Sequence, residues 1–272
     1  MGLHACFEAL AGQVHLRAPN GMVVPHRSGF TALPLARRVT MPRTAAVIPA
    51  AGRGLRAGGD RNKLLLPLDG RAVLLHTVRA LHDHPGIDAI TVIAAESDVP
   101  EWERVFHRRE HWPKLRPWVI GGAERQDSVW NGLQAWEADA PDWILIHDGA
   151  RPFVSPGLID RVLNALRRES AAVPVLPVAD TVRRIEGKTA QVQPRDLLYR
   201  TQTPQGFHWP LVHQAYLAAR EHGLRGTDDA QLVEAIGAPV AFVEGEARNI
   251  KLTAGMDYQL GAWLLAHPEW GI

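Results

Sequence analysis

The chain has 272 residues, of which 46% are hydrophobic and 22% charged, and its formal net charge at pH 7 is +1. This balance is ordinary for a globular protein and argues against a nucleic-acid partner held by bulk positive charge. No apolar stretch approaches the roughly 18 residues needed to span a membrane, and the single cysteine, Cys6, excludes an intramolecular disulfide and a cysteine-based metal cluster. We therefore expect a cytoplasmic, enzyme-sized protein that binds neither nucleic acid nor membrane.

Residues 1–43 differ from the rest and are predicted to be a leader. The first forty contain one acid, Glu8, against four arginines, which is typical of a transit peptide and would allow plastid import. The lack of serine enrichment favours instead a disordered leader, or a mis-assigned start with the true start at Met41. In each case we expect one folded domain over residues 44–268.

From Ala45 onward, short apolar runs alternate with segments of helical spacing. Strands are predicted over residues 45–48, 89–94, 118–120, 143–146, 171–178 and 240–243, and helices over residues 73–82, 128–138 and 158–168. Uninterrupted apolar strands that alternate with helices predict an α/β fold, a mostly parallel sheet with helices on both faces. In such sheets, ligands bind beyond the carboxyl ends of the strands.

Residues 180–203 break this alternation. Glu186-Gly187-Lys188 lies between two β-prone stretches and predicts a protruding hairpin. Because an isolated hairpin is marginally stable, we expect it to pack against another surface, such as a second copy of the chain.

The first predicted strand leads into a glycine-rich loop, Pro49-Ala50-Ala51-Gly52-Arg53-Gly54-Leu55-Arg56, and Lys63 follows. A strand that runs into such a loop presents backbone N–H groups to phosphate oxygens. The two cations Arg56 and Lys63 would then act on a nucleoside triphosphate, although by themselves they could also be solvated surface charges.

The same loop contains Gly52-x-Gly54-x-x-Ala57, which matches a dinucleotide-binding fingerprint. That fingerprint requires an acidic residue about 20 residues further on. Here the second strand ends near Glu96, forty-four residues after Gly52, so the spacing disfavours a nicotinamide or flavin cofactor.

Further polar residues follow later elements. Asp148 and Arg151 come directly after the strand over 143–146, where an acid can meet a metal ion or ribose hydroxyls, or can cap the next helix. His147 is interpreted as a packing residue at the strand end.

Gly121 to Ser128 form a second glycine-rich segment that could approach a ligand. The alternative role for Ser128 is that of a helix N-cap. Thr227-Asp228-Asp229 resembles a helix cap followed by first-turn acids.

These stretches occur in a specific order. The chain contains Pro-Ala-Ala-Gly-x-Gly-x-Arg…Lys, Gly-Gly-x-x-Arg-x-x-Ser-Val and His-Asp-x-Ala-Arg-Pro, followed by residues 180–182, 195–207, 227–234 and 249–253. Over roughly residues 45–266, the sequence closely resembles the 2-C-methyl-D-erythritol 4-phosphate cytidylyltransferase family of the non-mevalonate isoprenoid pathway.

The resemblance implies a Rossmann-like, GT-A-like nucleotidyltransferase domain whose hairpin arm, about 180–203, clasps a partner in a homodimer. It implies transfer of CMP from CTP to 2-C-methyl-D-erythritol 4-phosphate, which gives 4-diphosphocytidyl-2-C-methyl-D-erythritol and pyrophosphate. The Mg²⁺ cofactor would be held mainly by the triphosphate, with no metal site made of protein residues.

The resemblance also implies roles for individual residues. The catalytic cations correspond to Arg56, Lys63, Arg195 from the partner's arm and Lys251. The nucleotide-binding positions correspond to Pro49, Ala50, Ala51, Gly52, Gly54, Gly122, Ala123, Ser128 and Asp148. The positions that bind the acceptor substrate correspond to Asp148, Arg151, Thr181, Arg195, Thr203, Thr227 and Lys251.

Three residues depart from the family pattern. Asn62 stands where a proline is usual before the lysine, Gly149 replaces a usual alanine, and Arg248 replaces a common acid. We expect the first two to be tolerated and the third to alter the charge around Lys251. One rival function is a cytidylyltransferase for another polyol phosphate, such as ribitol 5-phosphate. A second is a noncatalytic nucleotide-binding protein, which would be expected to lose Arg56 or Lys63.

Overall fold

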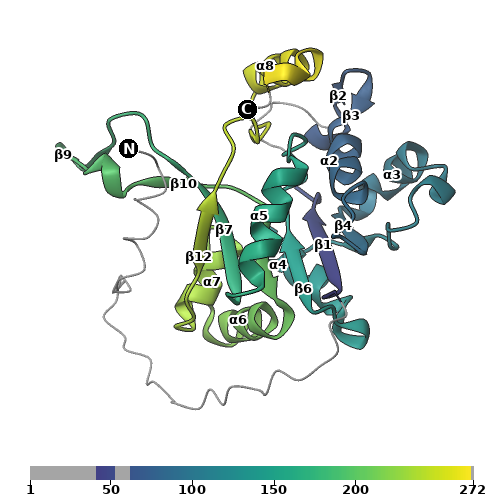
Figure 1. The fold of residues 1–272 in the computed structure, drawn as a ribbon, viewed down its shortest axis with the longest axis horizontal. Coiled ribbons are helices and arrows are strands. Elements are labelled where there is room, and N and C mark those ends of the chain that lie inside the picture. The colour runs from purple at the N-terminus through teal and green to yellow at the C-terminus, as the bar shows by residue number, and fades with distance from the viewer. Residues whose placement is uncertain (1–40, 53–61, 271–272) are drawn as a thin grey trace. The chain divides into compact units, whose positions relative to one another are not determined.

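The computed structural model of the chain describes residues 41–52 and 62–270, and within them the central sheet has eight strands. The strands are β1 (Thr44–Pro49), β4 (Ala89–Ala94), β5 (Val119–Ile120), β6 (Trp143–Ile146), β7 (Ala171–Pro177), β10 (Tyr199–Thr201), β11 (Gln205–His208) and β12 (Ala241–Glu244). Their order is β10-β7-β11-β6-β1-β4-β5, and β12 also pairs with β7. Figure 1 shows the sheet and the elements around it.

Most neighbouring strands run parallel. β1 pairs in parallel with both β4 and β6, β5 with β4, and β12 with β7. β11 is antiparallel to both β6 and β7, and β10 is antiparallel to β7. The predicted α/β class is therefore confirmed, with two antiparallel strands, β10 and β11, that the sequence pattern did not predict.

The helices form two layers, one on each face of the sheet. One hydrophobic cluster joins the sheet to α2 (Val73–His82), α3 (Val99–Val105), α5 (Pro156–Leu166) and α8 (Gly255–Ala266). The other joins it to α4 (Arg125–Gln134), α6 (Trp209–His222) and α7 (Asp229–Ala235). Successive side chains of a strand point to opposite faces, so in β1 Ile48 belongs to the first cluster and Val47 to the second.

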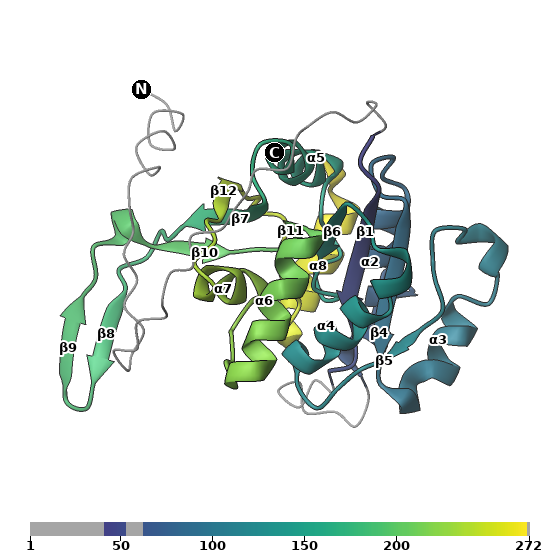
Figure 2. The same cartoon turned by 90° about the horizontal axis from the view of Figure 1, so that it is seen from below.

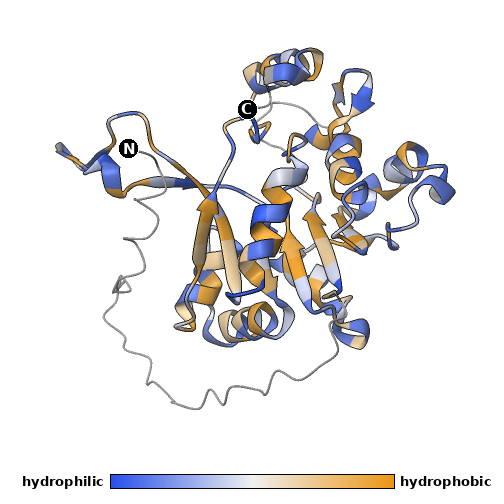
Figure 3. Cartoon of the chain, in the orientation of Figure 1, coloured by the Kyte–Doolittle hydropathy of each residue, from blue (hydrophilic) through white to orange (hydrophobic). Residues whose placement is uncertain are grey.

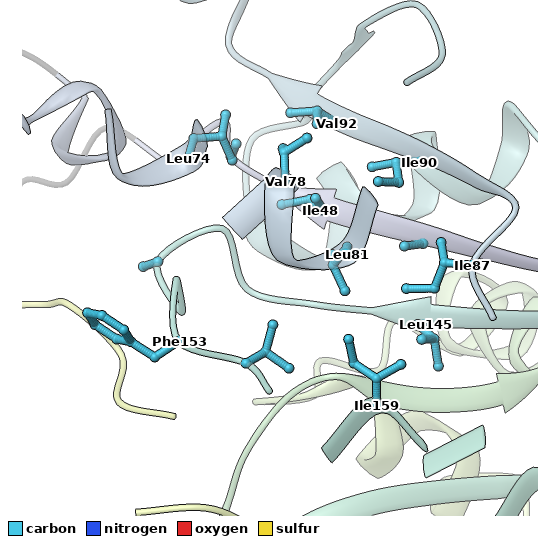
Figure 4. Packing of buried hydrophobic residues seen from close by; sticks show 14 of the residues in the cluster. Ile48, Leu74, Val78, Leu81, Ile87, Ile90, Val92, Leu145, Phe153 and Ile159 are labelled. Carbon is cyan, nitrogen blue, oxygen red and sulfur yellow. The ribbon is translucent and has the colours of Figure 1, made fainter. Parts of the chain in front are cut away.

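The central strands β1, β4 and β6 are almost entirely apolar because side chains on both of their faces are buried. Figure 3 shows the central strands as predominantly hydrophobic, and Figure 4 shows side chains of α2, β1, β4, β6 and α5 meeting in the first cluster. Ile48, Leu74, Val78 and Ile90 are fully buried there. This packing fixes the carboxyl ends of the strands, where the polar motifs lie.

Local sequence signals set several helix boundaries. The Ser155 hydroxyl accepts a hydrogen bond from the Leu158 N–H at the start of α5, and Asp228 caps α7 in the same way. Gly223 ends α6 in the left-handed conformation, with φ of 64°. The helix predicted over 128–138 is wrong at both ends, because α4 begins at Arg125 and ends at Gln134.

The predicted hairpin is present as β8 (Arg183–Glu186) and β9 (Thr189–Val192). They are joined by a turn in which Gly187 has φ of 59°, a conformation that favours glycine. Every residue of both strands is exposed, and Figures 1 and 2 show the arm projecting away from the central sheet. A second small hairpin pairs β2 (Pro67–Leu68) with β3 (Arg71–Ala72).

Among the residues described, no helix combines the length and the apolar character needed to cross a bilayer. Residues 1–40, which make up most of the expected leader, lie outside the described residues, as does the rest of the glycine-rich loop after Gly52 up to Arg61. The expected cytoplasmic location stays a prediction, as does plastid import.

Candidate active site

The centre of the site is Asp148, which follows β6 at the carboxyl edge of the sheet. Its carboxylate faces three cations: Oδ2 lies 2.9 Å from Lys251 Nζ and 3.5 Å from Arg151 Nε, and Oδ1 lies 3.4 Å from Arg125 Nε. Burial alone would raise the pKa of this carboxyl, but the charges of Arg125, Lys251 and Arg151 outweigh burial and hold the pKa well below its usual range. Asp148 is therefore ionised at neutral pH and surrounded by positive charge.

Arg125 is held in a fixed orientation by a second acid. Its two terminal nitrogens donate to the Asp229 carboxylate at 3.0 and 2.7 Å, in a bidentate pair, and the Tyr216 hydroxyl donates to the same carboxylate at 2.5 Å. Asp229 is fully buried. Burial alone would lower the pKa of Arg125, but the Asp229 charge raises it above its ordinary value. The sequence pattern indicated only a first-turn acid at Asp229 and gave Arg125 no role.

His147 and Thr203 connect β6 to the loop before β11. The Thr203 Oγ1 atom accepts the Asp148 backbone N–H at 3.0 Å and lies 3.1 Å from His147 Nδ1. The other ring nitrogen, Nε2, lies 3.0 Å from the Arg151 carbonyl oxygen, which can only accept. Nε2 therefore carries the proton and donates it to that carbonyl, and Nδ1 accepts from the Thr203 hydroxyl. The interpretation of His147 as a packing residue at the strand end agrees with its complete burial.

Residues 249–252 line the site beside the segment that follows β6. The Asn249 side-chain amide donates to the Thr203 carbonyl at 2.8 Å, and Arg151 donates to the Asn249 carbonyl at 2.7 Å. The Leu252 backbone N–H donates to the Ala150 carbonyl at 2.8 Å. These bonds fix the backbone that carries Lys251 next to Asp148.

Lys63 opens a short 3₁₀ turn (Lys63–Leu65) and reaches residues 249–252, because its Nζ donates to the Leu252 carbonyl at 3.1 Å. Asn62 caps this turn: its side-chain oxygen accepts the Leu64 N–H at 3.0 Å, and its amide donates to the Ala50 carbonyl and to Asp98, both at 2.8 Å. Asn62 thus fixes the Lys63 turn against the start of the loop. Its side-chain hydrogen bonds restrain the turn at the position where the family usually has a proline.

The other two departures also have a physical explanation. A Cβ atom added at Gly149 would lie 3.0 Å from Leu64 Cδ1 and 3.2 Å from Leu74 Cδ1, so glycine allows both leucines to approach the backbone closely. The Arg248 guanidinium donates to carbonyls at the end of α8, including that of Leu264 at 2.8 Å. The positive charge at residue 248 therefore binds carbonyl oxygens at the end of α8.

The second glycine-rich stretch lies beside the first loop. The Ser128 hydroxyl accepts the Gly122 N–H at 3.0 Å, and a Cβ at Gly121 would come within 2.4 Å of the Ala51 Cβ. Ser128 is buried within α4, so the alternative role of N-cap is wrong; the N-cap position belongs to Glu124. Gly52, Gly122 and Ala123 are exposed along this edge.

The structure brings some of the predicted site residues together and not others. The contacts above join Asp148 to Arg151, Lys251 and Thr203, and join Lys63 to the segment that contains Lys251. Among the described contacts of this single chain, Thr181 and Arg195 are not part of that cluster: they lie in or beside the arm, where Arg195 donates to the Ala179 carbonyl. Thr227 lies before α7 and bonds to Gln231. Gly54 and Arg56 lie outside the described residues.

The site residues do not fit a metal ion held by the protein. In the described part of the chain, no group of three or more His, Cys, Asp or Glu side chains is arranged to bind one. The Asp148 carboxylate already faces three cations. We therefore derive no step from a metal bound to these residues.

Burial of His147 predicts a specific loss of stability in acid. Burial lowers the pKa of His147 to about 4, from an ordinary value near 6.5. The stability that the neutral His147 side chain contributes is fully present above its unfolded-state pKa of ~6.5. It is lost as the pH falls through the folded-state pKa of about 4, and the total loss is about 3 kcal/mol. Between pH 7 and pH 4, the free energy of unfolding in urea should fall by about that much more in the native sequence than in His147→Gln.

The exposed His222 supplies the control, since His222→Gln should keep the pH dependence of the native sequence. Equal slopes for the native sequence and His147→Gln would contradict the expectation.

The mostly parallel α/β sheet, with basic side chains and the Gly121-Gly122 stretch at its carboxyl edge, is shared with solved nucleotidyltransferases, which places the chain in the class of α/β nucleotidyltransferases. Residues 44–267 match the sequence model of the family described as 2-C-methyl-D-erythritol 4-phosphate cytidylyltransferase. The chain belongs to this family, and the resemblance predicted from its ordered motifs is confirmed.

Individual relatives agree with the assignment. The chain is 44% identical over 223 residues to a 2-C-methyl-D-erythritol 4-phosphate cytidylyltransferase from Syntrophotalea carbinolica, covering 82% of this chain and 96% of the relative. A solved structure of the enzyme of that name from Thermus thermophilus is 38% identical with a TM-score of 0.64, covering 81% of this chain and 98% of that one. The 4-diphosphocytidyl-2C-methyl-D-erythritol synthase of Anaerococcus prevotii is 30% identical with a TM-score of 0.74, covering 84% and 100%.

Proposed function

We propose that this chain transfers CMP from CTP to 2-C-methyl-D-erythritol 4-phosphate and releases pyrophosphate, with residues 44–268 as its catalytic domain. The observation that carries the proposal is the basic cluster around Asp148, which lies at the edge where α/β sheets bind ligands. The family to which the chain belongs supplies the identity of the substrates.

The chemistry needs positive charge rather than a general base. A phosphate monoester has a second pKa near 6, so the acceptor phosphate is mostly ionised at neutral pH. One of its oxygens attacks the α-phosphorus of CTP, a new P–O bond forms, and the bond to the β-phosphate oxygen breaks as pyrophosphate leaves. Cations placed in advance around this centre stabilise the charge that develops on the nonbridging and leaving oxygens.

The residues divide between the two substrates. Lys63 acts on the triphosphate, and the family resemblance assigns the same role to Arg56, which lies outside the described residues. Backbone groups from Pro49 to Gly54, from Gly122 and Ala123, and the Ser128 side chain hold the nucleotide. Asp148 binds the ribose hydroxyls, while Lys251, Arg151, Thr203 and Thr227 hold the acceptor. Mg²⁺ would arrive on the triphosphate oxygens.

A pyrophosphate-release assay tests the function directly. The full chain is mixed with each of the four nucleoside triphosphates, with 2-C-methyl-D-erythritol 4-phosphate or ribitol 5-phosphate as acceptor. Release with CTP and the methylerythritol phosphate supports the proposal. A higher kcat/KM with ribitol 5-phosphate would assign the chain to another polyol phosphate. CTP binding without release would indicate a noncatalytic protein.

We further propose that the arm clasps a second copy of the chain and that its residues Thr181 and Arg195 complete the partner's site. The arm exposes apolar side chains, of which Ile185 and Leu197 are 70% and 73% accessible. An exposed hairpin of this kind has little stability of its own, and a symmetric partner would cover the apolar side chains of both arms.

Hybrid dimers test this proposal. If Arg195 acts in the partner's site, a dimer of one Arg195→Ala chain and one Lys63→Ala chain contains one intact site and one doubly defective site. Random exchange makes half of the dimers hybrids, so about a quarter of the wild-type activity should return. Labelled subunits would show whether exchange has occurred. If the subunits exchange and no activity returns, Arg195 acts in the site of its own chain or has no role in catalysis.

A further inference from the structure

The C-terminal helix α8 contacts Lys63. The Tyr258 hydroxyl, in the first turn of α8, donates to the Lys63 backbone carbonyl at 2.9 Å. The Lys63 side chain in turn donates to the carbonyl of Leu252, which lies six residues before Tyr258 in the sequence. The same C-terminal segment therefore holds both the backbone and the side chain of Lys63.

Hydrogen bonds hold both ends of α8. At the start, the Asp257 carboxylate accepts from the Thr253 and Ala254 backbone N–H groups at 2.6 and 2.8 Å. At the end, the Arg248 guanidinium donates to the carbonyls of Leu264 and Pro268 at 2.8 and 3.2 Å. Figure 1 shows α8 beyond the carboxyl ends of the parallel strands.

Between these ends, only a narrow stripe of α8 is buried. Gly261 and Leu264 are its buried residues, whereas Met256 is 79% exposed. A Cβ at Gly261 would lie 3.2 Å from both Leu68 Cδ1 and Phe153 Cζ, so glycine lets the helix approach these two side chains. In addition to this packing, the Tyr258 and Arg248 hydrogen bonds link the two ends of α8 to the rest of the domain.

We propose that Tyr258 is a positioning residue for Lys63, and that Arg248 stabilises the helix that carries Tyr258. This inference rests on the proposed catalytic role of Lys63. Lysine is a point charge on a flexible four-carbon stem, and a displacement of about 1 Å can cost about a hundredfold in rate. A hydrogen bond to its backbone carbonyl reduces the range of positions that the ammonium group can reach.

The test is Tyr258→Phe, which removes one hydroxyl and keeps the aromatic ring. Steady-state kinetics with CTP and 2-C-methyl-D-erythritol 4-phosphate should show kcat lowered about three- to tenfold, the effect of about one hydrogen bond. KM for CTP should change less than about twofold, because the lost alignment matters mainly in the transition state. Arg248→Gln should lower kcat in the same direction but less. Met256→Ala, on the exposed side of the same helix, should leave both constants unchanged.

A double-mutant cycle separates positioning from a general structural effect. If Tyr258 acts through Lys63, adding Tyr258→Phe to Lys63→Ala should lower single-turnover activity by less than about twofold further. A full further loss of about three- to tenfold would overturn the proposal, and so would an unchanged kcat in Tyr258→Phe together with a lower melting temperature.

The two hypotheses also fail in different ways. A Lys63→Ala protein with near-normal turnover would overturn the role of Lys63 and the positioning inference with it. If Lys63→Ala is impaired and Tyr258→Phe is fully active, only the positioning inference is overturned.

Discussion

Replacing Lys63 by alanine is expected to lower kcat for CMP transfer about 10²–10³-fold, because one preorganised donor to the developing charge would be lost. The structure places the Lys63 ammonium 3.1 Å from the Leu252 carbonyl, next to the segment that carries Lys251. Pyrophosphate release at saturating CTP and acceptor measures the effect. Lys63→Arg keeps the charge but changes its geometry, so it should retain more activity than the alanine variant.

Lys114 provides a matched control for this experiment. Its Nζ also donates to a backbone carbonyl, that of His84, at 2.8 Å. It lies beside the amino end of β4, because its own carbonyl accepts the Ile90 N–H. Lys114→Ala should therefore keep near-normal kcat. Equal losses at Lys63 and Lys114 would mean that a general structural effect, and not charge at the reacting phosphate, explains the result.

Replacing Asp229 by alanine is expected to lower the free energy of unfolding by about 3 kcal/mol, because it breaks an ion pair with a fully buried carboxylate and leaves Arg125 with only its longer contact to Asp148. Asp229 is fully buried and binds both terminal nitrogens of Arg125 as well as the Tyr216 hydroxyl. Urea denaturation at a single protein concentration measures the change, since stability depends on concentration if the chain is a dimer.

The adjacent Asp228 supplies the control. It is the N-cap of α7, partly exposed, and it also accepts a hydrogen bond from the Gln205 side-chain amide at 2.9 Å, so its loss should cost about 1–2 kcal/mol. A loss for Asp229→Ala no larger than for Asp228→Ala would contradict the importance of the buried pair. Because Arg125 also faces Asp148, we expect Asp229→Ala to weaken CTP binding in the protein that remains folded.

Much of the fold was predictable from local pattern. β4, β6 and α2 have the predicted bounds, because each is a continuous apolar run or a clear helical repeat that ends at a turn. β11 was not predicted, since Gln205-Gly206-Phe207-His208 lacks the continuous apolar run of β4 and β6. Gly206 is needed there because a Cβ would lie 2.5 Å from Val162 Cγ1 of α5. Only the packed helix reveals that constraint.

The candidate site was predictable where a motif follows a strand. Asp148 and Arg151 come from one motif and Lys251 from a separate one, and the structure brings all three into contact. Arg125 occurs in a motif too, but its bidentate bond to Asp229 spans 104 residues of sequence. A pairing of that kind leaves no periodic signal, so the contact between Arg125 and Asp229 could not be predicted before the fold was known.

The sequence by itself determined the α/β class and the family, because both depend on local runs and on the order of short motifs along the chain. Only the tertiary structure decided how charges are paired around Asp148, which nitrogen of His147 carries its proton, and that Tyr258 connects α8 to Lys63. The physical reason is that burial and hydrogen-bond geometry depend on residues distant in sequence, whose distances are set when the helices pack on the sheet.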